Sequence, residues 1–169
     1  MLNWDLILTH GAIYSIVSSI YLVILLRIDS RMFLSKGDYP DDVLAAVPPR
    51  SKEETRKATI LSAPWLLWSL ALPVYSAFRY VASEGEIPPF WAVSLHAFLI
   101  FFSFWLVDLV VLDMIMFAWI TPKFIIIPGS EGFPGYKDIR WHLRGHFKTG
   151  LPLLVVLGLV VGGIVWLVG

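Results

Sequence analysis

The sequence predicts an all-α integral membrane protein, with four transmembrane helices in a single domain at residues 1–169. Apolar residues make up 57% of the chain and charged residues only 15%, whereas soluble domains are usually about half apolar and a quarter charged. Uncharged stretches cover residues 6–26, 58–78, 87–107 and 149–169, and a membrane helix needs about 20 residues. The predicted transmembrane helices are residues 6–26, 58–79, 89–120 and 150–168.

The basic residues predict how these helices are oriented. Of the thirteen Lys and Arg residues, seven lie in the connector at residues 27–57, five lie in the segment at residues 121–149, and Arg79 alone lies elsewhere. Because basic loops are retained in the cytoplasm, both segments are expected there, with the N-terminus and the C-terminus outside. The compact chain and its lack of a recognisable eukaryotic sorting signal point to a prokaryotic cytoplasmic (inner) membrane.

The first predicted span has a polar stripe that should face the interior of the helix bundle. The stripe consists of His10, Tyr14, Ser18 and Tyr21, at steps of four, four and three residues. His96 lies at a similar depth in the third span. Two such imidazoles could ligate a haem iron, although histidines that hydrogen-bond between packed helices are the commoner arrangement.

The connector at residues 27–57 mixes seven basic with six acidic residues and is expected to be largely solvated. Ser51 and Glu54 have the spacing of a capping box, which predicts that a helix begins there and continues into the second span. That span contains Pro64 and Pro73. A proline removes a helical hydrogen bond and leaves a backbone carbonyl without its usual partner.

The third span is polar on two sides, and it contains the strongest candidate site residue, Asp108. His96 and Ser103 share one helical face, and Asp108 lies nearly opposite, so the helix is either central in the bundle or faces a partner subunit. An intramembrane carboxylate suggests a contact for a proton, a cation or a substrate, or an ion pair that stabilises packing. Asp113 follows five residues later, which is about 140° around an α-helix. The two carboxylates are therefore expected on different faces.

The fourth span contains Gly158 and Gly162, a spacing that lets two helices approach closely. The partner helix is either in the same chain or in a second copy of it.

The segment at residues 121–149 is predicted to form a β-like strand with a turn, followed by a cytoplasmic interfacial amphipathic helix at about residues 136–148. One stripe of this helix is apolar, one is basic and one contains two histidines. Their members are Ile139, Leu143 and Phe147; Arg140, Arg144 and Lys148; and His142 and His146. The basic stripe is expected to bind anionic lipid headgroups or a phosphate.

The two histidines of that helix could hold a divalent metal, because they are four residues apart. Asp113 or Glu131 would supply a third ligand. Two histidines that titrate at an anionic surface are the simpler interpretation.

Composition excludes several functions. The chain has no Cys, which excludes disulfides and thiol redox chemistry. Its net charge is zero, which does not favour a nucleic-acid partner. Neither haem nor a divalent metal is required by the sequence, and whether the protein is an enzyme is left open.

With no recognisable catalytic motif, the sequence favours a small transporter, a channel or an accessory membrane subunit, as a homo-oligomer or with a partner membrane subunit. One alternative is an inner-leaflet enzyme or binding protein for a lipid-linked phosphate. Its site would consist of Asp108 and Asp113, His142 and His146, and Arg140 and Arg144. A second alternative is a b-type haem protein that uses His10 and His96.

Overall fold

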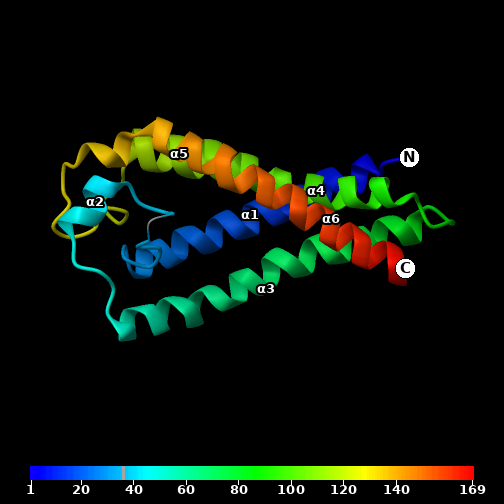
Figure 1. Cartoon of the computed structure of the whole chain (residues 1–169), viewed down its shortest axis with the longest axis horizontal. Coiled ribbons are helices and arrows are strands. Elements are labelled where there is room, and N and C mark those ends of the chain that lie inside the picture. The colour runs from blue at the N-terminus through cyan, green and yellow to red at the C-terminus, as the bar shows by residue number, and fades with distance from the viewer. Residues whose placement is uncertain (36) are drawn as a thin grey trace.

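The computed structural model describes residues 1–35 and 37–169, and it is all-α in this part of the chain (Figure 1). Lys36, one of the basic residues of the first connector, lies outside the described residues. Four of the described helices are long and apolar enough to cross a membrane: Trp4–Ile28, Lys52–Ser83, Phe90–Ile120 and Ile139–Val168. The predicted all-α fold, with four helices of membrane-spanning length and composition, is confirmed.

Two of these long helices contain segments of π-helix. The elements, in chain order, are α1 (Trp4–Ile28), α2 (Asp41–Ala46), α3 (Lys52–Ser83), α4 (Phe90–Val107), the π-helix η1 (Asp108–Ile120), the 3₁₀-helix η2 (Pro134–Lys137), α5 (Ile139–Gly145), the π-helix η3 (His146–Gly150) and α6 (Leu151–Val168). Both termini lie at one end of the molecule, and both long connectors lie at the other (Figure 1).

Helix α4 is central in the bundle and packs against the other three spans. Ser103 of α4 donates a hydrogen bond to the Gly11 carbonyl of α1, at 3.1 Å. His96 contacts Ser76 of α3 at 2.8 Å. Of the two positions expected for the third span, the central one is therefore the position found.

The two glycines of α6 pack inside this bundle. A Cβ atom placed on Gly162 would lie 2.6 Å from the Ser94 nitrogen of α4, and one on Gly158 would lie 3.1 Å from the Phe98 Cα. The two helices approach this closely because neither glycine has a side chain. The glycine pair therefore packs α6 on α4 of the same chain.

The polar stripe of α1 faces the bundle, as predicted: Tyr14 and Ser18 are buried. The Tyr14 hydroxyl donates to the Ser69 carbonyl of α3 at 3.3 Å. Pro73 has no N–H and cannot donate to the Ser69 carbonyl, which lies four residues earlier in α3. The Tyr14 hydroxyl supplies the missing donor.

The two long connectors pack together into a small apolar unit, which we call the connector cap. Its buried residues are Leu34, Tyr39, Val43 and Val47 from the first connector and Ile125, Ile127 and Tyr136 from the second. The Asp42 carboxylate accepts a hydrogen bond from the Gly135 nitrogen at 2.8 Å. The expectation that the first connector is largely solvated is wrong for Leu34, Tyr39, Val43 and Val47, because these side chains are buried against the second connector.

The strand predicted after the third span is absent, because residues 121–133 form turns. The nitrogen of Ile125 donates to the Pro122 carbonyl at 2.9 Å, and the nitrogen of Ser130 donates to the Ile127 carbonyl at 3.0 Å. Ile125 and Ile127 are fully buried. Their side chains are buried in the connector cap, and no described segment pairs with this one as a strand.

The separate interfacial helix predicted at residues 136–148 is also wrong. The helix begins at Ile139, is capped by Asp138, which accepts from the Trp141 nitrogen at 3.0 Å, and continues into the fourth span as one 30-residue helix. Ile139 and Phe147 point outward, whereas His142 is buried. The histidine stripe, and not the apolar stripe, therefore faces the bundle.

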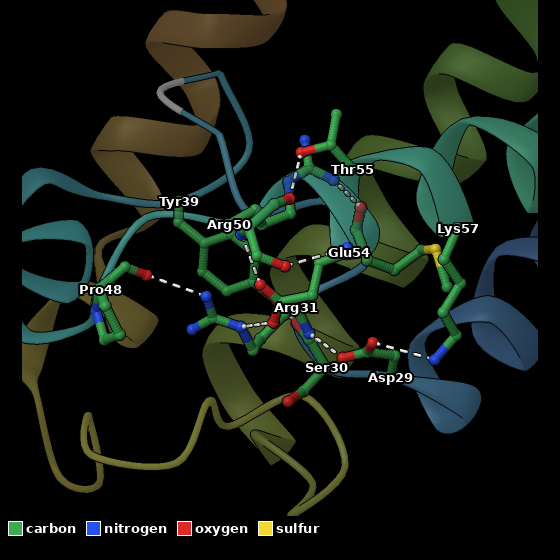
Figure 2. Close-up of polar contacts among 11 residues, drawn as sticks. Asp29, Ser30, Arg31, Tyr39, Pro48, Arg50, Glu54, Thr55 and Lys57 are labelled. Carbon is green, nitrogen blue, oxygen red and sulfur yellow. Dashed lines mark hydrogen bonds and ion pairs between the residues drawn. The ribbon is translucent and has the colours of Figure 1, made fainter.

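The first connector is attached to the start of α3 by Arg31 (Figure 2). The Arg31 guanidinium lies 2.7 Å from the Glu54 carboxylate and donates to the Pro48 carbonyl at 2.9 Å. Glu54 also accepts from the Ser51 nitrogen at 2.6 Å, which completes the predicted capping box. One carboxylate thus caps α3 and binds the connector.

Replacing Arg31 with alanine is expected to loosen this connector, because the Pro48 carbonyl and Glu54 both lose a charged donor. Limited proteolysis within residues 29–51 should become several-fold faster. Lys57→Ala is the matched control: its ammonium contacts Asp29 at 3.2 Å in an exposed pair, and such pairs contribute little. Equal rates of proteolysis for the wild type and the Arg31 variant would contradict the role of Arg31 in holding the connector.

Candidate functional site

The π-helix η1 changes the relation between the two carboxylates of the third span. In a π-helix the backbone bonds link residues five apart, so Asp108 and Asp113 lie about one turn from each other. The expectation that they occupy different faces is wrong, because it assumed α-helical geometry throughout. Segments of π-helix are rare and often occur at functional sites.

Asp113 is the centre of a four-residue cluster that we call the Asp–His cluster: Asp108, Asp113, His142 and His146. Asp113 Oδ2 lies 2.8 Å from His146 Nε2 and 3.0 Å from His142 Nδ1. Asp108 Oδ2 is more distant, 3.8 Å from His146 Nε2. One carboxylate oxygen therefore contacts both imidazoles, and the second carboxylate lies beside them.

The helix formed by α5 and η3, which packs against η1, positions the two histidines. They are four residues apart, on the side of α5 and η3 that packs against η1. The ring of Phe117 lies edge-on to His142 at 6.0 Å, and the ring of Trp105 lies edge-on to His146 at 5.4 Å. The side chains of His142 and His146 are only 5% and 12% exposed. The cluster is thus fixed by aromatic packing and by the shared contact with Asp113.

The Asp–His cluster lines a cavity of about 770 Å³ at the connector end of the bundle, which we call the connector-end cavity. Its apolar wall includes Leu22, Leu26, Phe33, Trp65, Phe104, Leu112, Met116 and Phe117. Its polar lining includes Asp38, Tyr39, Asp108, Asp113, His142, Arg144, His146 and Lys148. The cavity therefore combines an apolar wall with charges of both signs.

Only part of the predicted basic stripe lines this cavity. Arg144 and Lys148 line it, whereas Arg140 is exposed and is not among its lining residues. Arg27, at the end of α1, lies over the Phe124 ring, 4.7 Å from its centre, and is also not among the lining residues. Two of the three predicted phosphate-binding residues are thus positioned to meet a ligand in the cavity.

The predicted metal pair has a different partner in the structure. Both imidazoles meet a single oxygen of Asp113, and Glu131 accepts hydrogen bonds from its own neighbour, the Gly129 nitrogen, at 3.0 and 3.1 Å. Within residues 1–35 and 37–169, no group of three or more His, Cys, Asp or Glu side chains is arranged to hold a metal ion.

The predicted haem pair lies in the other half of the bundle, with a serine between its members. The Ser76 hydroxyl is 2.9 Å from His10 Nδ1 and 2.8 Å from His96 Nε2. His96 is fully buried and stacks on Tyr80, with ring centres 4.7 Å apart. One nitrogen of each imidazole thus lies within hydrogen-bond distance of the same hydroxyl, which links α1, α3 and α4.

Sequence reasoning missed the part of the cavity that comes from the first connector. Asp38 and Tyr39 line the cavity, although no motif singles them out. Burial, together with the nearby Tyr136, raises the pKa of the Tyr39 hydroxyl, so this group stays protonated at neutral pH. It donates to the Ser30 carbonyl at 3.0 Å. Only the packing of the two connectors brings these residues to the site.

Comparisons with family models, curated proteins and solved structures found no significant match for this chain. Its function is therefore inferred from the site alone.

Proposed function

We propose that this chain is an integral membrane protein of a prokaryotic cytoplasmic membrane, with both termini outside and the connector-end cavity at the inner leaflet. Large apolar side chains on the outward faces of the long helices support insertion, among them Ile16, Ile20, Leu67 and Val156. The orientation follows from the basic residues of the two connectors, which lie together at one end (Figure 1).

We further propose that the connector-end cavity binds an amphiphile with a phosphate headgroup, that is, a lipid-linked phosphate. The observation that supports this best is that one cavity contains both an apolar wall and two cations, Arg144 and Lys148. Its volume of about 770 Å³ lies in the range of pockets that enclose small ligands. The acyl or prenyl part would contact the apolar wall, and the phosphate would bind the cations.

Binding is favoured over a continuous pore because the opposite half of the bundle is filled. Val93, Ala97 and Ile100 of α4 are fully buried there, in a core that also includes Val161 and Val165 of α6. A transporter or a channel would have to open this core. An accessory subunit would have to use another surface than Gly158 and Gly162, which already pack within the chain.

The test compares lipids that copurify with the wild type and with two variants. Replacing both Arg144 and Lys148 with alanine is expected to reduce retained anionic phospholipid about tenfold or more, because charge-assisted hydrogen bonds to phosphate are lost. Arg140→Ala is the matched control, from the same helix but outside the cavity. Mass spectrometry of the extracted lipids gives the result. Unchanged retention in the double variant, or an equal loss in Arg140→Ala, would contradict the proposal.

A further inference from the structure

We infer that the headgroup bound in the connector-end cavity has a hydrogen-bond donor in addition to its phosphate, and that this donor, a hydroxyl or an ammonium, binds Asp108. The inference rests on the proposed function and specifies its ligand class. It follows from a difference between the two carboxylates of the Asp–His cluster.

Asp113 already has its partners. Its Oδ2 atom contacts His142 at 3.0 Å and His146 at 2.8 Å, and its side chain is only 18% exposed. A ligand that approached this oxygen would have to displace an imidazole. Asp113 therefore orients the histidines through Oδ2, and its side chain is less exposed to a headgroup than that of Asp108.

Asp108 differs from Asp113 in both exposure and contacts. Its side chain is 31% exposed and lines the cavity, and its nearest basic group in the described part of the chain is His146 Nε2, at 3.8 Å. That distance is too long for a hydrogen bond. The Asp108 carboxyl offers at least one acceptor oxygen whether or not it is ionised, so it presents an acceptor to whatever occupies the cavity.

A headgroup with phosphate oxygens alone would bind Arg144 and Lys148 but would offer no donor to the acceptor oxygen of Asp108 in the same cavity. A headgroup that adds a hydroxyl or an ammonium beyond the phosphate satisfies both sets of groups. A site with buried polar groups discriminates strongly against an analogue that lacks the matching donor. Asp108 is thus the residue that selects among amphiphiles with a phosphate headgroup.

The test uses the full-length protein in detergent and lipids with the same acyl chains. Phosphatidylglycerol and phosphatidylmethanol both have one negative charge, and only the first has hydroxyls. We expect phosphatidylglycerol or phosphatidylethanolamine to bind at least about tenfold more tightly than phosphatidylmethanol. A hydrogen bond from the headgroup to Asp108 would account for a difference of this size. A preference for the glycerol lipid identifies a hydroxyl, and a preference for the ethanolamine lipid identifies an ammonium.

Asp108→Asn is expected to reduce this preference to about threefold or less without weakening the binding of phosphatidylmethanol, because the amide replaces one acceptor oxygen with a donor. Asp41→Asn, in the exposed first turn of α2, is the control and should keep the preference. If the wild type binds all three lipids equally, the inference fails and the proposed function stands. If the wild type binds none of them, both fail. The comparison of the three lipids uses only the wild type, so it does not depend on whether a variant folds.

Discussion

Replacing Gly162 with alanine is expected to lower the free energy of unfolding by about 3 kcal/mol. The added Cβ would lie 2.6 Å from the Ser94 nitrogen, and a backbone atom of α4 cannot rotate away as the end of a side chain can. The clash is therefore relieved only if α6 moves away from α4, and packing between the two helices is then lost. Unfolding in mixed micelles, with increasing denaturing detergent, measures the loss.

The next residue provides a control for this prediction. A Cβ on Gly163 would lie 3.6 Å from the Phe90 ring, an ordinary van der Waals distance, so Gly163→Ala should leave stability within about 0.5 kcal/mol of the wild type. Both substitutions replace a glycine of α6 with alanine, so the change in helix propensity is the same in the two variants. If the two variants are equally stable, close packing of α6 on α4 at Gly162 is not what holds these helices together.

The second large effect is expected from Asp113→Leu, which should lower the free energy of unfolding by about 3 kcal/mol. The leucine has a similar size, but it removes the oxygen that contacts both His142 and His146. Two buried imidazoles would then lack their acceptor. Thermal unfolding in detergent measures this effect.

Two further variants separate the loss of an acceptor from the loss of a carboxylate. Asp108→Asn, one π-turn away and more exposed, should cost about 1 kcal/mol or less. Replacing Asp113, His142 and His146 together with leucine should recover most of the stability, because the two buried imidazoles that would lack their acceptor are then also gone. A triple variant as unstable as Asp113→Leu would show that the histidines are not the reason for the effect.

The sequence was sufficient to predict those features that depend on hydropathy and on local spacing. The four long helices follow from uncharged stretches of membrane length, and the cap of α3 follows from the spacing of Ser51 and Glu54. The inward stripe of α1, with Tyr14 and Ser18, follows from steps of three and four residues. These are local properties, and packing between distant segments does not alter them.

The Asp–His cluster was predicted only in part. Asp108, Asp113, His142 and His146 were each recognised as candidates, and the structure brings all four together. Their mutual geometry was not predictable, because it depends on a π-helical register that no residue between Asp108 and Ile120 announces. With α-helical spacing, Asp113 would point away from Asp108. The contribution of Tyr39 was missed because it depends on packing between segments that are far apart in the sequence.

The connector cap also bears on the order in which the chain assembles during synthesis. Leu34 and Val43 emerge long before Ile125 and Tyr136, the residues that bury them. Until the second connector has been made, the apolar side chains of the first have no lasting partner, and the cavity lacks the part of its lining that begins at Trp141. The connector-end cavity is therefore completed last, after the third long helix has been synthesised, and a nascent chain that stops earlier exposes apolar surface that a chaperone or a protease can recognise.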